Sequence, residues 1–139
     1  MPDNLTREQR SYMMSRVRST DTTPELLIRR LVHAKGLRYR KHCPWLPGRP
    51  DLAFIAAKVA VFVNGDYWHG WRFPCWKQKL SPYWQEKIEG NRRRDSVNSR
   101  RLRHEGWLVV RVWEHDIEHD AHGCASRIEA AVRGRLGAA

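Results

Sequence analysis

The stretch DLAFIAAKVAVFVN, residues 51–64, decides the fold of this 139-residue chain. It contains two short apolar runs, residues 51–55 and 58–64, which predict a hairpin of buried or half-buried strands. A further apolar run, WLVVRVW at residues 107–113, predicts another strand of the buried or mixed kind. These runs supply most of the strands that the chain needs for one sheet.

Segments with helical character surround the predicted strands. Thr23, Pro24 and Glu25 combine an N-cap residue, an N1 proline and a first-turn acid, so they predict a helix over residues 24–35 that stops near Gly36. The remaining predicted elements are a first strand at 37–41, a long loop at 65–82, a helix at 82–103 and a last helix at about 116–134. This order of helices and strands predicts an α/β layer fold around a mixed sheet.

The charge of the chain points to a polyanionic partner. Lys and Arg number 26 against 15 Asp and Glu, which gives a formal net charge of +11. Nucleic acid is the first expectation for so basic a small protein, although a charge-coating protein or simple solubility would give the same composition. The length allows one core, so we expect a basic N-terminal arm or helix at residues 1–22 and a single domain at residues 23–139.

The cysteines and the N-terminus indicate a cellular compartment. Cys43, Cys75 and Cys124 are few, odd in number and far apart, which fits reduced thiols better than a disulfide framework. The first 20 residues lack the apolar core of a signal peptide, and no segment has the apolar length to span a bilayer. We therefore expect a soluble intracellular protein without a membrane partner.

The predicted helix at 82–103 has two contrasting faces. A step of four and three residues places Trp84, Ile88, Asn91, Asp95, Asn98 and Leu102 on one face. Burying an unpaired carboxylate or amide is costly, so the polar members of this face are expected to line a cleft. The opposite side carries Arg92, Arg93, Arg94, Arg100, Arg101 and Arg103, which form either a solvated face or a surface for DNA phosphates.

Two further segments contain candidate catalytic groups. Asp51 follows Pro50 at the predicted start of a strand, where its carboxylate is either a ligand for a hard divalent cation or an acceptor in a turn. His69 is a candidate general base, although a lone histidine is more often a surface or satisfied one. Tyr67 and Trp68 lie beside it and can stack on bases or wedge between them.

Three ordered blocks of sequence, taken together, resemble one known family. They are PGRPDLAF (47–54), VFVNGDYWHG (61–70) and the long block YWQEKIEGNRRRDSVNSRRLRHEGWLVVRVWEHDI (83–117). The chain is similar over residues 8–118 to the very short patch repair (Vsr) endonucleases of the PD-(D/E)xK superfamily. The resemblance implies a restriction-endonuclease-like three-layer fold, with a central mixed β-sheet flanked by helices.

The same resemblance implies roles for individual residues. Asp51 and the backbone carbonyl of Val63 would bind Mg²⁺, while Glu25 and His69 would act on metal-bound or attacking water. Asp95 would orient His69 or support the metal shell, and Tyr67, Trp68 and Trp84 would form an aromatic wedge beside a T:G mismatch. The family cuts one strand 5′ to the mismatched thymine. Further residues expected to contact DNA are Asn91, Arg92, Arg93 and Arg49.

The chain departs from the family pattern in two places. Better-known members bind a structural zinc with Cys and His, whereas the corresponding positions here are Asp66, Trp71 or Phe73, and His115. We expect zinc to be absent, with Asp66, Cys75 and His115 as a weak partial set. The second departure is Asn64, which occupies the position of a family histidine in the catalytic set and cannot act as a base.

Three functions stay open at the level of sequence. The first is a magnesium-dependent nicking endonuclease acting on mismatched double-stranded DNA. The second is a DNA-binding module with weak or lost catalysis, and the third is a restriction-type or resolvase-type nuclease that does not select mismatches. Mismatch-repair proteins are candidate partners, and the expected oligomeric state is a monomer.

Overall fold

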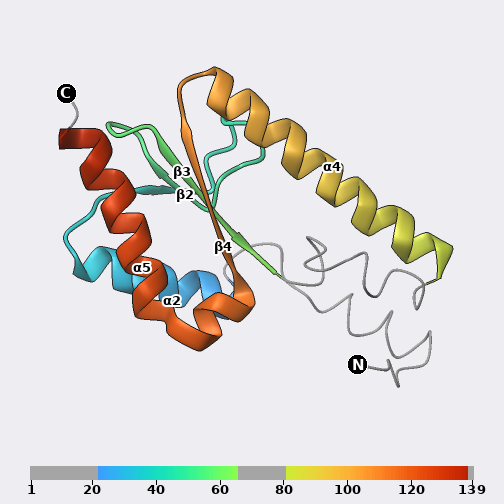
Figure 1. Ribbon diagram of the computed structural model, residues 1–139, viewed down its shortest axis with the longest axis horizontal. Coiled ribbons are helices and arrows are strands. Elements are labelled where there is room, and N and C mark those ends of the chain that lie inside the picture. Colours follow the sequence, from blue (N-terminus) through green and yellow to red (C-terminus); the bar gives the residue numbers. More distant parts are fainter. Residues whose placement is uncertain (1–21, 66–80, 138–139) are drawn as a thin grey trace.

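The computed structural model describes residues 22–65 and 81–137 of the chain. Figure 1 shows these residues as three helices around one small sheet. In chain order the elements are α2 (Thr23–Ala34), β1 (Arg40–Lys41), β2 (Leu52–Phe54), β3 (Val59–Asn64), α4 (Pro82–His104), β4 (Leu108–Trp113) and α5 (Glu114–Gly137). The predicted order is confirmed, while the predicted basic arm and most of the loop at 65–82 lie outside the described residues.

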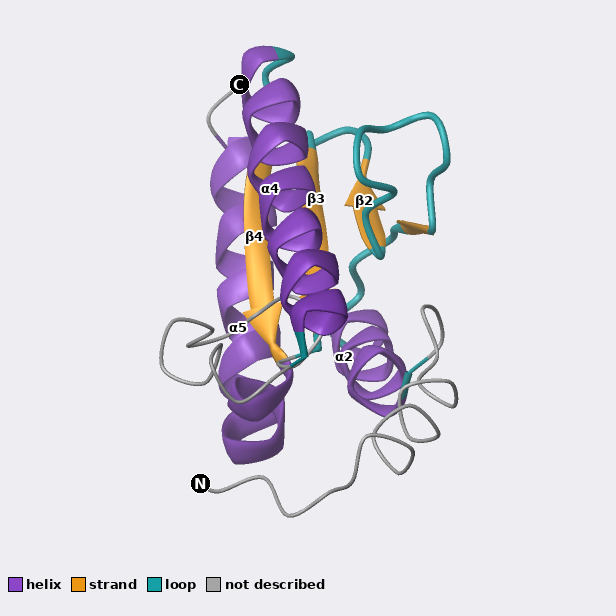
Figure 2. Ribbon diagram, turned by 90° about the vertical axis from the view of Figure 1, so that its right-hand side faces the viewer, coloured by secondary structure: helices purple, strands orange, loops and turns teal. Residues whose placement is uncertain are grey.

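The sheet is mixed, as the sequence predicts. Its strand order is β1-β2-β3-β4. The pairs β1/β2 and β2/β3 are antiparallel, and β3 and β4 are parallel, with Val59 opposite Leu108 and Asn64 opposite Trp113. Two parallel neighbours require a crossover connection, and α4 lies within it. The sheet therefore lies between α4 on one face and α2 with α5 on the other (Figures 1 and 2).

Both faces of the central strands are buried, which explains why β3 is an almost continuous apolar run. Val59 and Val61 belong to the core shared with α2 and α5, whereas Ala60 and Phe62 pack in a second core with Leu102 of α4. A strand covered on both faces needs apolar groups at every position rather than at alternate ones. The three-layer architecture thus follows from the sequence of β3.

Two predicted elements differ in extent from the observed ones. The first strand is limited to Arg40–Lys41, because Leu37 is buried in the core and Tyr39 packs edge-on against Phe54 at 6.1 Å between ring centroids. The last helix starts earlier and ends later than predicted, and it contains a kink at Asp120. An oxygen of the Asp120 carboxylate accepts a hydrogen bond from the Gly123 backbone at 2.9 Å, so it caps the helical segment after the kink.

The far end of α5 is attached to three separate turns of the chain. Arg133 donates to the Lys35 carbonyl at 3.2 Å, and Arg135 donates to the carbonyls of Ala57 at 3.0 Å and Gly106 at 2.6 Å. Along its length α5 supplies five buried residues, Ile117, Cys124, Ala125, Ile128 and Val132. No helix in the described part of the chain is long and apolar enough to cross a membrane.

Candidate active site

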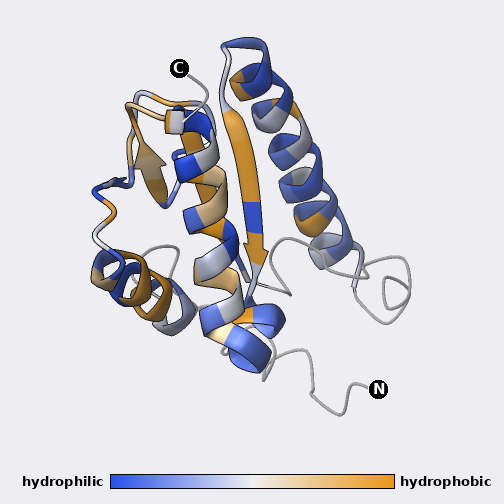
Figure 3. Cartoon of the chain, turned by 60° about the vertical axis from the view of Figure 1, so that its left-hand side comes forward, coloured by the Kyte–Doolittle hydropathy of each residue, from blue (hydrophilic) through white to orange (hydrophobic). Residues whose placement is uncertain are grey.

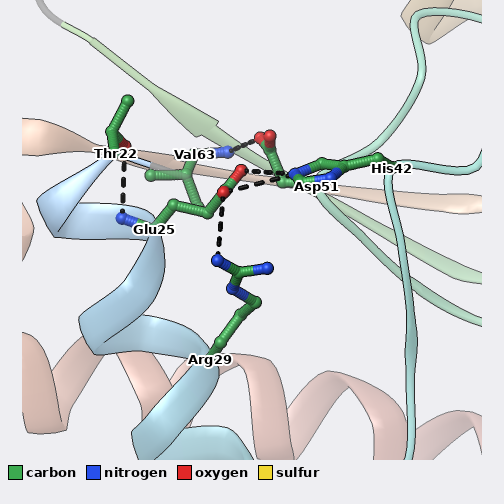
Figure 4. Close-up of polar contacts among 6 residues, drawn as sticks. All are labelled: Thr22, Glu25, Arg29, His42, Asp51 and Val63. Carbon is green, nitrogen blue, oxygen red and sulfur yellow. Dashed lines mark hydrogen bonds and ion pairs between the residues drawn. The ribbon is translucent and has the colours of Figure 1, made fainter. Parts of the chain in front are cut away.

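Four segments that are distant in sequence meet at one place beside the sheet. They are the first turn of α2, the residue after β1, the bend before β2 and the end of β3, and Figure 4 shows their side chains. Glu25, His42 and Asp51 each offer a donor atom there, and these atoms lie within 4.8 Å of one another. No other group of three or more His, Cys, Asp or Glu residues gathers in this way among residues 22–65 and 81–137.

Glu25 is held at this place by the start of α2. The hydroxyl of Thr22 caps the helix and accepts from the Glu25 backbone N–H at 3.4 Å. The Glu25 side chain is 2% exposed, and its carboxylate lies 3.6 Å from the guanidinium of Arg29, one helical turn later. A buried carboxylate needs such partners, because it loses its hydrogen bonds to water, and leaving them unreplaced costs free energy of folding.

His42 is the member of this group that the sequence analysis missed. Its Nε2 atom lies 3.1 and 3.2 Å from the two carboxylate oxygens of Glu25. The backbone of His42 has φ of 51°, in the left-handed region that histidine adopts more readily than most residues. The only signal in the sequence is a histidine between a short basic strand and Pro44, which does not reveal a partner 17 positions away.

Asp51 faces Glu25 from the bend that precedes β2. Its Oδ2 atom accepts a hydrogen bond from the backbone N–H of Val63 at 2.6 Å. Burial, a hydrogen bond to Glu25 and the Glu25 charge raise the pKa of Asp51 from 3.8 to about 8, against the lowering effects of the Val63 N–H and Arg29. The ionised form of Asp51 is therefore disfavoured while this site holds no cation.

The chemistry of this group fits a divalent cation. The carboxylates of Glu25 and Asp51 are suitable ligands for a hard cation, and a bound cation would favour the ionised form of Asp51, which burial and Glu25 oppose. Asp51, the predicted magnesium ligand, belongs to the group. The observed contact of Val63 is through its N–H, so coordination by its carbonyl stays a prediction.

Comparison with known proteins identifies the family. A family model for the DNA mismatch endonuclease Vsr matches residues 2–75. The type II nicking enzyme V.NmeDIP of Neisseria meningitidis serogroup C is 41% identical, over 97% of this chain and 93% of that protein. The chain belongs to the Vsr family. The DNA mismatch endonuclease Vsr of Escherichia coli K12 is 33% identical to this Vsr-family chain, over 82% of it and 74% of the relative. The protein is accordingly a DNA endonuclease, which hydrolyses phosphodiester bonds.

The fold of this Vsr-family protein also matches a solved structure. The catalytic domain of the homing endonuclease I-Bth0305I superimposes with a TM-score of 0.59, at 18% identity, over 84% of this chain and 99% of that domain. The likeness confirms the restriction-endonuclease-like fold that the resemblance implied.

Asn64, the residue that departs from the Vsr pattern, lies beside an arginine. The Asn64 side chain is 2% exposed, and its amide oxygen accepts from Nη1 of Arg111 at 3.5 Å. The Arg111 guanidinium also donates to the backbone carbonyl of Asp95 at 2.9 Å and to the Ser99 hydroxyl, and it lies 4.6 Å from the centre of the Phe62 ring. Sequence reasoning missed Arg111, because an arginine inside WLVVRVW gives no sign of its neighbours.

Arg111 is a half-buried positive charge that interacts electrostatically with Asp95 and Asp51. Burial lowers its pKa, while the charges of Asp95 and Asp51 act in the opposite direction. Residue 64 of this Vsr-family chain is therefore an asparagine whose side-chain amide is held by the Arg111 guanidinium. Unlike a histidine ring, this amide does not titrate.

The predicted polar face of α4 is present in this Vsr-family chain. Trp84, Ile88 and Leu102 are buried, and Asn91, Asp95 and Asn98 are half-buried. Asp95 does not join the Glu25, His42 and Asp51 group among the described residues. Its predicted role beside His69 stays a prediction, as does the contact of Asn91 with DNA.

The structure describes some of the predicted wedge and zinc residues of this Vsr-family chain and not others. His69, Tyr67, Trp68, Asp66 and Cys75 lie outside the described residues. Trp84, the third predicted wedge residue, is 8% exposed, whereas the neighbouring Tyr83 is 60% exposed and stands edge-on to it at 5.0 Å between ring centroids. His115 is the described member of the weak zinc set. Its Nε2 atom lies 3.4 Å from Oδ1 of Asp116, and its ring stacks on that of Trp113.

The predicted DNA-contacting arginines of the Vsr-family chain lie on its surface. Arg49 is exposed in the loop that leads to Asp51, and all six arginines of the basic side of α4 are exposed. In Figure 3 the visible side of α4 is mainly hydrophilic, whereas β4 beside it is mainly hydrophobic. A phosphate-binding role for these arginines stays a prediction.

Proposed function

We propose that this Vsr-family endonuclease nicks one strand of duplex DNA 5′ to the thymine of a T:G mismatch, with Mg²⁺ as its cofactor. The observation that carries the proposal is the cluster of Glu25, His42 and Asp51, which brings two carboxyl groups together at one place beside the sheet, as a hard cation requires. The Escherichia coli relative, named a DNA mismatch endonuclease, supports the choice of a mismatched substrate.

A bound divalent ion would neutralise charge on the phosphate and favour ionisation of a nearby water. Asp51 would bind the ion through its ionised carboxylate, and the ion would favour this form against the burial that raises the pKa of the group. Glu25, held between His42 Nε2 and the guanidinium of Arg29, would accept a proton from the attacking water through a carboxylate oxygen. His69 is the second proposed group for this proton transfer.

We further propose that the enzyme works as a monomer in the bacterial cytoplasm, where it would meet chromosomal DNA. Light scattering of the protein with and without a duplex tests the monomer. Mismatch-repair proteins remain candidate partners for recruitment to the lesion.

The first test is cleavage of a labelled T:G duplex and its matched control, with Mg²⁺ or with EDTA. We expect Mg²⁺-dependent cuts in one strand of the T:G duplex alone. The Asp51→Ala variant should lose them, whereas Asp116→Ala, which removes an acid with a 46% exposed side chain, should retain them.

The other two functions predict different results in the same assay. Binding of both duplexes without cleavage by the wild type would indicate a DNA-binding module. Equal cleavage of matched DNA, or preferred cleavage of a four-way junction, would indicate a restriction-type or resolvase-type nuclease.

A further inference from the structure

His42 has a direct contact in the site that none of the predicted catalytic roles covers. Its Nε2 atom is nearly equidistant from the two oxygens of Glu25, at 3.1 and 3.2 Å. We propose that His42 is a positioning residue, whose Nε2–H fixes the Glu25 carboxylate in the orientation that faces Asp51. The inference deepens the proposed hydrolytic function and rests on it.

The proposal assigns this hydrogen to the imidazole. A carboxylate oxygen accepts hydrogen bonds, so with Glu25 ionised and Nε2 of His42 protonated, the ring donates to the two oxygens that lie 3.1 and 3.2 Å away. The Arg29 guanidinium forms an ion pair with the same carboxylate, at 3.6 Å from its Oε2 atom. His42 differs from Arg29 in that it comes from another segment of the chain, the one that follows β1.

The backbone around His42 is itself tied to Asp51. The His42 N–H donates to the Asp51 carbonyl at 3.2 Å, across the base of the loop between β1 and β2. Cys43 and Leu46, at 1% and 8% exposure, anchor this loop in the core. The imidazole thus links the segment that carries Asp51 to the helix that carries Glu25, and it sets the relation between the two acids.

Two amide substitutions of His42 test the geometry of this contact. Gln can place an amide N–H near the position of Nε2, so His42→Gln should retain the hydrogen bond. Asn is too short to reach Glu25, but it accepts the left-handed backbone at least as well as histidine does. His42→Asn therefore removes the contact while the backbone conformation at residue 42 stays accessible.

The first readout is Mg²⁺ and Mn²⁺ binding by calorimetry, with melting temperatures of the metal-free proteins as the measure of folding. We expect His42→Asn to weaken metal binding by about 10 to 100-fold, the usual effect of losing a group that orients a ligand. His42→Gln should bind within a few-fold of the wild type. His33→Gln, at an exposed position of α2, is the matched control and should not differ from the wild type.

A second readout is the single-turnover nicking rate at saturating metal and DNA. His42→Asn should lower this rate without changing the Kd for DNA, and His42→Gln should restore it. Equal losses in the Gln and Asn variants would mean that the imidazole itself is required, and would overturn the positioning role. Wild-type metal binding and nicking by His42→Asn would overturn it as well. Calorimetry also separates this inference from the proposed function, because metal binding is measured even if the wild type cuts no T:G duplex.

Discussion

Asp51 carries a pKa of about 8 because burial and Glu25 both oppose its ionisation, and this makes the stability of the metal-free protein depend on pH. Between its ordinary pKa of 3.8 and about 8, the folded chain holds a proton that the unfolded chain releases. The free energy of unfolding should therefore fall as pH rises, by up to about 1.4 kcal/mol per pH unit. Urea denaturation in EDTA from pH 5 to pH 8 measures this decline.

The Asp51→Asn variant isolates the contribution of this carboxyl group. An amide cannot ionise, so we expect the decline with pH to flatten and the variant to be more stable than the wild type at pH 8. Asp116→Asn is the control for loss of a surface acid. Parallel stability curves for wild type and Asp51→Asn would show that the proton is not held at this pair.

Arg111 is expected to matter for folding as well as for the site. Arg111→Met would remove the donor to Asn64 and Ser99, which are 2% and 4% exposed, and would leave their oxygens without that partner. We expect a loss of about 2 to 4 kcal/mol in the free energy of unfolding, measured with urea. Arg103→Met removes an exposed arginine of α4 and should cost far less; an equal loss would contradict the structural role of Arg111.

Residues of the site differ in how far sequence could identify them. The resemblance to the Vsr family singled out Glu25 and Asp51, and the structure brings them together. His42 and Arg111 could not be predicted, because their contacts join positions 17 and 47 apart and depend on a left-handed backbone or on strand register. Long-range contacts of this kind leave no periodic pattern in the sequence.

At the scale of elements, α4 presents a basic side that we expect to bind DNA phosphates. Arg93 and Arg100 are seven residues apart, both are exposed, and helical geometry places them on the same side. Replacing both with Ala should weaken binding to matched and mismatched duplexes alike and should reduce the slope of log K against log salt by about 2.

Arg30→Ala with Arg38→Ala gives a control with the same change in net charge. Both of these arginines are exposed: Arg30 belongs to α2, which covers the face of the sheet opposite to α4, and Arg38 lies between α2 and β1. Fluorescence anisotropy at several salt concentrations compares the two double variants. Equal losses of affinity would indicate that only net charge matters and that α4 has no special role.

Elements with a strong local signal were predicted well, and those shaped by packing were not. Pro24 marks the start of α2 within one residue of its observed bound, but the capping residue is Thr22 and not the predicted Thr23. The first strand was predicted too long because Leu37 and Tyr39 were included in it. Their side chains pack in the hydrophobic core, but both residues lie before β1 and outside the sheet. The kink at Asp120 was missed because an aspartate inside a helical pattern gives no warning that it caps a new segment.

At the scale of the whole molecule, the order of elements predicted the layers but not the place of the site. The predicted order indicated an α/β layer fold around a mixed sheet, and the structure shows that β3 and β4 are a parallel pair covered on both faces. Where Glu25 meets Asp51 depends on how α2 packs against the sheet, which the sequence order leaves open. The family resemblance, rather than periodicity, connected these two residues.

The attachments of α5 have a consequence for how the protein is made. A ribosome releases the chain from its N-terminal side, so α2 and the four strands emerge before α5 does. Until α5 arrives, one face of the sheet lacks Ile128 and Val132, and the turns at Lys35, Ala57 and Gly106 lack their arginine partners. A nascent chain on the ribosome therefore carries its acidic residues without a finished core to hold them, and the nuclease can become competent only after α5 has been synthesised.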